Sequence, residues 1–342
     1  MNFASDNTAG CHPKIIQALA DANDGRRMPY GRDDETNRVR TIVSDTFDTD
    51  CDVFLVATGT AANGLALSAC VPGHGAVVCH ETSHINEHEG TGPAMFTGGA
   101  KLIGLAAGDG KIDPAEVDHG VMTGRGDEHY AQVKALSITQ LTERGTAYTV
   151  DQISAIGDVC RKHGLAMHMD GARFANAMVG LNCSPADMTW KAGVDVVSFG
   201  GTKNGALALE AVVIFNKALA AEFLYKQKRA GQLLSKMRFM SVQMEAYLKD
   251  DLWLLNARHS NAMAKRLADG LGNIQDVEIT QSVDGNQVFP RLPAATVERL
   301  KAAGFLFYDR GAGPDGRHLI RLVLAFNTEP ADVDKFIATA GG

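Results

Sequence analysis

Short apolar runs bounded by glycine and polar residues recur along the first 250 residues of the chain. They lie at residues 53–56, 133–139, 165–169, 194–199 and 211–215. Each has the length of a buried strand, and stretches of helical character separate several of them. Strands that alternate with helices predict an α/β fold whose large domain carries a mostly parallel sheet.

The pattern changes at about residue 250. A long amphipathic helix to residue 271 is followed by short strands near 277–280, 287–292, 306–308 and 319–326, with helices at 294–303 and at the C-terminus. This rhythm predicts a smaller C-terminal α+β domain. We therefore expect a large domain at 1–249, opened by a polar N-terminal arm at 1–40, and a small domain at 250–342.

Composition excludes several function classes. The 342 residues suffice for one large or two ordinary domains. The 33 basic and 40 acidic residues give a net charge of −7 without long runs of one sign, which predicts no nucleic-acid partner. No apolar stretch is long enough to span a membrane and no secretory signal opens the chain, so we expect no membrane partner and a cytoplasmic location. The six cysteines form no C-x-x-C pair, which argues against a disulfide framework and a zinc site.

Two charged side chains follow predicted strands. The first strand runs into Asp170-Gly171-Ala172-Arg173 and the second into Gly200-Gly201-Thr202-Lys203. Alone, Asp170 would be an ordinary turn residue and Lys203 an ordinary surface lysine. Together they suit pyridoxal phosphate, which needs a lysine to hold it covalently and an acid to keep its ring nitrogen protonated.

A turn of small residues at 57–64, directly after the predicted strand at 53–56, opens an alanine- and leucine-rich helix. Such a turn leaves backbone N–H groups free at the positive end of the helix dipole, where a phosphate can bind. Gly59 and Thr60 are the expected phosphate ligands. A capped helix without a ligand would explain this turn by itself, and the downstream lysine favours the phosphate.

The segment 77–89 is rich in titratable groups. His84, Glu87 and His88 fit the H-x-x-E-H pattern of some zinc peptidases, which makes a metalloprotease one alternative. Against it, the histidines directly follow a strand, and residues 90–93 (Gly-Thr-Gly-Pro) break the helix before it can complete a metal site. We therefore assign no metal ligands.

These motifs resemble the threonine aldolase and β-eliminating lyase family of fold-type-I pyridoxal-phosphate enzymes, and the resemblance covers nearly the whole chain. It implies a carbon–carbon lyase (aldehyde-lyase) that cleaves L-3-hydroxy-α-amino acids such as L-threonine, L-allo-threonine or phenylserine to glycine and an aldehyde. It also implies a homodimer or homotetramer with shared active sites. The same cofactor could support β-elimination or transamination, which stay open as alternatives.

The resemblance also implies roles for individual residues. Lys203 and Asp170 are catalytic, together with His84, which stacks on the cofactor ring. Cofactor contacts extend to Arg173, Thr202 and, from a partner subunit, Arg238. The substrate would be held by Ser5, Tyr30, Arg173 and Arg321.

Two features of the chain bear on these roles. Arg321 lies in an apolar strand, where an arginine is hard to bury without an anionic partner. Family members often carry an Asn and a His after the strand at 133–139, and this chain has Gln140, Thr142 and Glu143 there instead. The departure leaves the handling of the substrate hydroxyl open.

Overall fold

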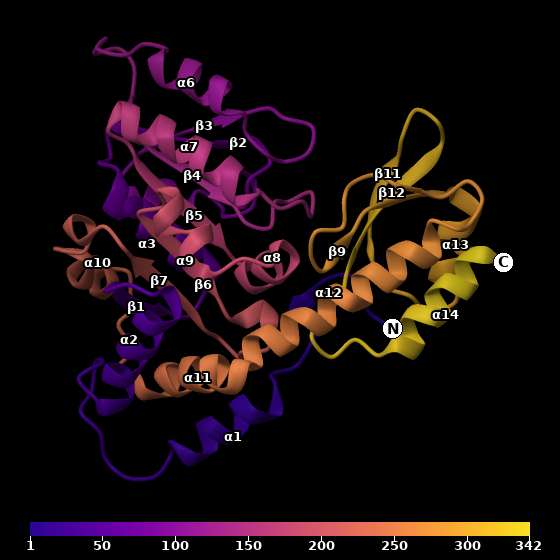
Figure 1. The fold of residues 1–342 in the computed structure, drawn as a ribbon, viewed down its shortest axis with the longest axis horizontal. Helices are drawn as coiled ribbons and strands as arrows, with labels where there is room; N and C mark the ends of the chain where they lie inside the picture. The colour runs from indigo at the N-terminus through magenta and orange to yellow at the C-terminus, as the bar shows by residue number, and fades with distance from the viewer.

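The computed structural model describes all 342 residues and contains a seven-stranded sheet in the order β1-β7-β6-β5-β4-β2-β3 (Figure 1). Only β7 runs antiparallel to its neighbours, β1 and β6. The predicted mostly parallel sheet is confirmed. Its strands are β1 (Asp52–Val56), β2 (Gly75–His80), β3 (Lys101–Leu105), β4 (Gln132–Thr139), β5 (Ala166–Gly171), β6 (Val196–Gly200) and β7 (Glu210–Ile214).

Helices cover both faces of this sheet, which is why its central strands are apolar throughout rather than alternating. Val197 and Val213 face a core shared with the helices α2 (Asp34–Phe47), α7 (Val150–His163) and α11 (Arg238–Leu248). Val196 and Val212 point the opposite way, into a core shared with α3 (Gly59–Cys70) and α10 (Phe223–Arg229). The period of two along each strand thus fills two cores.

Helix boundaries follow local capping chemistry. The Thr149 side chain and Gln152 form a capping box at the start of α7, and Gly164 ends that helix in the left-handed conformation. The Asp33 side chain caps α2 by accepting a hydrogen bond from Thr36 N. None of the helices combines the length and apolar character needed to cross a membrane. They are α1 (Pro13–Asp21), α2 (Asp34–Phe47), α3 (Gly59–Cys70), α4 (His84–Glu87), α5 (Gly92–Thr97), α6 (Pro114–Met122), α7 (Val150–His163), α8 (Phe174–Leu181), α9 (Pro185–Met188), α10 (Phe223–Arg229), α11 (Arg238–Leu248), α12 (Leu252–Leu271), α13 (Ala294–Ala302) and α14 (Pro330–Gly341).

A smaller antiparallel sheet follows in the order β11-β12-β10-β8, with β9 paired to β12. Its strands are β8 (Glu278–Ile279), β9 (Gln287–Val288), β10 (Pro290–Pro293), β11 (Tyr308–Ala312) and β12 (Arg317–Val323). The strand expected at 306–308 starts only at Tyr308. Figure 1 shows α12 running from the helices of the large sheet to this small α+β layer, which confirms the predicted smaller domain. The boundary at 249/250 stays a prediction.

The N-terminal arm is tied to this small layer. Phe3 is buried in its core, with ring centroids 6.0 Å from Phe305 and 5.5 Å from Phe336. Backbone hydrogen bonds join Phe3 to Leu306 and Val323. This anchoring holds the next residues, Ser5 and Asp6, in a fixed place beside both sheets.

Candidate active site

A cavity of about 480 Å³ brings together predicted residues from distant parts of the chain. Its walls come from the N-terminal arm, the segment after β2, the loop after β4, the ends of β5 and β6, and the small sheet. Five of the predicted site residues line it, namely Ser5, His84, Arg173, Lys203 and Arg321. Its other lining residues are Asn7, His88, Glu143, Tyr308, Asp309 and Arg310. Carboxyl ends of adjacent parallel strands are the usual place for a ligand in an open α/β sheet.

Asp170 lies at the C-terminal end of β5, and Lys203 follows the paired strand β6, where Gly171 lies opposite Phe199. Asp170 is buried and accepts hydrogen bonds from Asn63 Nδ2 (2.8 Å) and Ala172 N (3.0 Å), but no cation pairs with it. Lys203 donates no hydrogen bond and forms no ion pair within the chain. A buried carboxylate without a cation and a free amine fit a cofactor with a protonated ring nitrogen and an aldehyde carbon.

The N-terminus of α3 offers an anion-binding site that the phosphate of the same cofactor could occupy. The Thr58 side chain caps Ala61 N, and the N–H groups of Gly59 and Thr60 donate to no acceptor in the chain. A Cβ added at Gly59 would meet nothing within 4 Å, so the turn is open. Asn63, one turn further along α3, holds Asp170. The turn therefore fits the phosphate of a cofactor whose ring lies against Asp170.

Hydrogen bonds connect Asp170 to His84 through two residues that the sequence reasoning missed, Asn63 and Glu89. Asn63 Nδ2 donates to Asp170 Oδ2 (2.8 Å) and to Glu89 Oε1 (2.7 Å), and Glu89 Oε1 lies 2.9 Å from His84 Nδ1. Asn63 and Glu89 are buried. A polar residue inside the otherwise apolar α3 was the available signal for Asn63. The network fixes the ring of His84 relative to Asp170.

The electrostatics of this network follow from its geometry. The hydrogen bond to Glu89 raises the pKa of His84, and the negative charges of Asp170 and Glu143 raise it further. Burial raises the pKa of the Glu89 carboxyl, despite its hydrogen bonds to His84 and Asn63. The pair therefore keeps its proton to a higher pH than either group would in water.

Glu89→Gln should lower the pKa of His84, because a neutral amide replaces the carboxylate that stabilises the imidazolium. The measurement is an NMR titration of the His84 ring in the cofactor-free protein. Glu87→Gln, an exposed change beside His88, is the matched control and should leave His84 unchanged. An equal His84 pKa in wild type and Glu89→Gln would contradict this account of the network.

The two predicted carboxylate-binding arginines differ in the structure. Arg173 is buried and donates from Nε (2.8 Å) and Nη2 (3.0 Å) to the carboxylate of Asp6. Burial opposes ionisation of Asp6, but Arg173 and Lys203 hold its pKa below the ordinary value. The buried Nε of Arg321 has no partner, and the guanidinium carbon lies 5.3 Å from the centre of the Tyr308 ring. Arg321 is thus the arginine free to take a carboxylate, and Asp6 is a further residue that the sequence reasoning missed.

A fourth missed residue, Glu210, lies opposite Gly200, the last residue of the strand that precedes Lys203. It is buried at the start of β7 and accepts a hydrogen bond from Gly201 N (3.3 Å). Burial raises its pKa to about 7, although the charge of Lys203 acts in the opposite direction. The structure thus keeps a largely neutral carboxyl group below the cavity under mildly acidic conditions.

Glu210 should make stability fall as pH rises. Its folded-state pKa lies above its unfolded value, so the native state binds more protons in between, and stability declines from about pH 4.5 to pH 7. Glu210→Gln removes this term, worth on the order of 3 kcal/mol. The measurement is urea unfolding of the cofactor-free proteins at pH 5 and pH 8. Between these pH values the free energy of unfolding should fall further in wild type than in Glu210→Gln. A pH-independent difference between the two proteins would contradict the buried titration.

A model of the β-eliminating lyase family matches residues 2–294. The chain belongs to this family. It is 44% identical over 306 residues to a low specificity L-threonine aldolase of Pseudomonas aeruginosa, covering 90% of this chain and 88% of that one. It is 41% identical to a protein of the same description from a Pseudomonas species, covering 98% and 96%. A solved Leishmania major threonine aldolase superimposes with a TM-score of 0.93 at 30% identity, covering 99% and 98%. The predicted family and its fold-type-I architecture are confirmed.

Besides Asp170 and the turn at Gly59 and Thr60, three more predicted site residues of this β-eliminating lyase family member do not line the cavity. The Thr202 hydroxyl bonds to the backbone of Leu209 and holds the turn after Lys203. Tyr30 and Arg238 lie on one surface, where the loop 25–31 packs on the segment between α10 and α11. There Tyr30 N donates to Ser235 O (3.1 Å) and Arg238 Nη1 to Gly25 O (3.1 Å). Their roles stay predictions.

The zinc-peptidase pattern gains no support from the geometry around it. The helix α4 that carries His84 has only four residues. The ring of His84 stacks beside that of His88 at 5.7 Å, while its Nδ1 bonds to Glu89. No three His, Cys, Asp or Glu side chains converge as metal ligands would.

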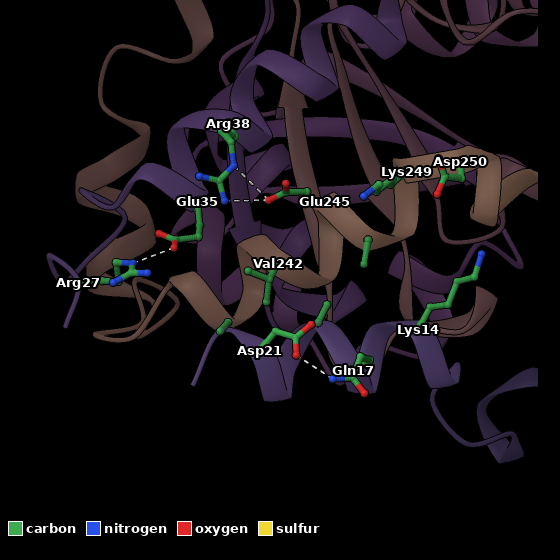
Figure 2. A pocket seen from close by; sticks show the side chains of 13 residues that line it. Lys14, Gln17, Asp21, Arg27, Glu35, Arg38, Val242, Glu245, Lys249 and Asp250 are labelled. Atoms are coloured by element: carbon green, nitrogen blue, oxygen red, sulfur yellow. Dashed lines mark hydrogen bonds and ion pairs between the residues drawn. The ribbon is translucent and has the colours of Figure 1, made fainter. Parts of the chain in front are cut away.

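A second cavity, of about 460 Å³, lies between α1, α2 and α11 (Figure 2). Four of its charged side chains form two ion pairs. Arg27 lies 2.9 Å from Glu35, and Arg38 lies 3.2 Å from Glu245. None of the predicted site residues lines it, and we place no active site there.

Proposed function

We propose that the protein is a pyridoxal-phosphate-dependent aldehyde-lyase that cleaves L-3-hydroxy-α-amino acids to glycine and an aldehyde. The observation that carries this proposal is a cavity lined by Lys203, Arg321 and His84, the last of which is connected through Glu89 and Asn63 to the buried carboxylate of Asp170. The names of the Pseudomonas relatives support the same activity.

Pyridoxal phosphate, when bound, supplies an electron sink that stabilises a carbanion at the amino acid's Cα. Lys203 would anchor it, the N–H groups of Gly59 and Thr60 would hold its phosphate, and Asp170 would keep its ring nitrogen protonated. Arg321 and Ser5, which line the same cavity as Lys203, would hold the substrate carboxylate. His84, oriented by Glu89, would lie against the ring.

Incubation of the holoenzyme with L-threonine alone tests the reaction class. Glycine and acetaldehyde in equal amounts are the expected products. Ammonia and a 2-oxo acid would instead indicate β-elimination, and a strict requirement for an oxo-acid acceptor would indicate an aminotransferase. A panel of L-threonine, L-allo-threonine and phenylserine then defines the aldehyde substituent that the cavity accepts.

We further propose that active sites are shared between two chains in a homodimer, or in a homotetramer built from two such dimers, located in the cytoplasm. Tyr30 and Arg238 lie away from the cavity of their own chain. No cationic side chain bonds within its own chain to the turn at Gly59 and Thr60, although a bound phosphate would favour one. A partner's Arg238 would meet that need.

Two inactive variants should then rescue each other. In a mixed dimer of Lys203→Ala and Arg238→Ala chains, one site collects both changes and the other collects neither. With random pairing about half the dimers are mixed, so about a quarter of all sites should be fully active. The two proteins are unfolded, refolded together and assayed. Activity equal to the mean of the parents, with mixed dimers present, would place Arg238 within its own chain's site or outside the site.

A further inference from the structure

The loop after β4 is held rigidly by two of the three residues at which the chain departs from its family. Gln140 is buried, and its side chain bonds both to the backbone N–H and to the carbonyl of Tyr148, each at 2.9 Å. Thr142 is buried and bonds to the Thr146 hydroxyl (2.8 Å). That hydroxyl in turn donates to Asp109 O (2.7 Å). Neither Gln140 nor Thr142 lines the cavity, so both serve to fix the loop.

The third departing residue, Glu143, directly follows Thr142 and lines the cavity with Lys203, His84 and Arg321. It is half-buried, and its carboxylate accepts no hydrogen bond and forms no ion pair in the chain. Its charge is close enough to His84 to add to the rise in that residue's pKa, after Glu89 and Asp170. Glu143 is therefore a carboxylate without a partner, presented to the substrate by a fixed loop.

Most other polar groups of the cavity are engaged or unsuited as bases. Lys203 is the cofactor anchor in the proposed function, and Arg321 is a permanent cation. Asp309 bonds to His318 (2.9 Å) and pairs with Lys301 (3.1 Å). His84 is held through Nδ1 by Glu89 in an orientation suited to stacking. Glu143 and the exposed His88 remain as acceptors with no hydrogen bond to break, and of the two Glu143 lies on the loop that Gln140 and Thr142 fix.

We propose that Glu143 is the base that takes the proton of the substrate β-hydroxyl, which deepens and rests on the proposed function. As the O–H proton passes to the carboxylate, the O–H electron pair becomes the second bond of the aldehyde carbonyl, and the Cα–Cβ bond breaks. The electron pair of that bond stays with Cα, where a proton then replaces the aldehyde and gives glycine. In the reverse direction the Glu143 carboxylic acid returns the proton to the aldehyde oxygen.

The test compares two reactions of the same holoenzyme. Cleavage of L-threonine needs a base for the hydroxyl proton, whereas exchange of the α-proton of glycine in D₂O uses the same cofactor apparatus without any hydroxyl. Glu143→Gln should slow cleavage by roughly a hundredfold or more and leave glycine exchange within a few-fold of wild type. Because a catalyst cannot shift an equilibrium, addition of glycine to acetaldehyde should slow by the same factor.

Two further variants and one physical measurement sharpen the result. Glu143→Asp keeps a carboxylate and should cleave faster than Glu143→Gln. Glu128→Gln makes the same charge change on an exposed loop and should behave as wild type. In the cofactor-free proteins, the NMR-measured pKa of His84 should fall in Glu143→Gln and not in Glu128→Gln, because only Glu143 lies near the ring.

Each contrary outcome has a distinct meaning. Undiminished cleavage by Glu143→Gln would overturn the assignment, as would equal loss of cleavage and glycine exchange, which would make Glu143 a support of the cofactor. If His84→Phe keeps exchange and loses cleavage while Glu143→Gln retains cleavage, His84 is the base. Wild-type enzyme that exchanges the glycine proton yet forms no aldehyde would instead overturn the proposed function, and this inference with it.

Discussion

Lys203→Ala should lose turnover by at least about a thousandfold, equivalent to about 4 kcal/mol of transition-state stabilisation. Lys203 is the lysine that lines the cavity, and its amine is free of ion pairs and hydrogen bonds, as a covalent anchor requires. Without it the cofactor would be held only by non-covalent contacts, and its characteristic visible absorption band should disappear. Steady-state assays and absorption spectra of purified protein measure both effects.

Borohydride reduction provides an independent check, because it makes the bond between lysine and cofactor permanent. The reduced wild-type enzyme should carry the label on the peptide containing Lys203. Lys335→Ala, an exposed change on α14, is the control and should retain both the band and the activity. An undiminished rate in Lys203→Ala, or a label on another lysine, would refute the assignment of the anchor.

Asp170→Asn should keep much of its bound cofactor yet lose most activity, by roughly a hundredfold or more. Both oxygens of Asp170 accept hydrogen bonds, one from Asn63 and one from Ala172 N. An amide can accept at one position only, so one buried donor loses its partner. More importantly, a neutral amide cannot stabilise the protonated ring nitrogen on which the electron sink depends. Turnover and cofactor content are measured on the same samples.

Asp195→Asn is the matched control for Asp170→Asn. Asp195 accepts a hydrogen bond from Met167 N (2.8 Å) near the start of β5, at the far end of the strand from Asp170. Its replacement removes a similarly bonded carboxylate outside the cavity and should leave the rate per folded molecule unchanged. Near-normal turnover in Asp170→Asn would move the electron-sink function to another residue.

The sequence by itself determined five of the seven strands of the large sheet, their alternation with helices and the pair formed by Asp170 and Lys203. Hydrophobic periodicity is a local property, and it reports burial on one or both faces of an element. Because parallel strands share one carboxyl edge, charged residues that directly follow neighbouring strands must lie close together. This is why two strand-end motifs sufficed to predict the centre of the site.

Only the tertiary structure decided which other polar groups join that centre. Asn63, Glu89 and Asp6 reach Asp170, His84 and Arg173 through contacts between elements far apart in the chain, and no local pattern encodes those distances. The structure also divided the residues after β4 into two that anchor the loop and one, Glu143, that is left free. Whether a polar side chain is buried and paired depends on what the fold packs against it, and that determines which residues remain available for chemistry.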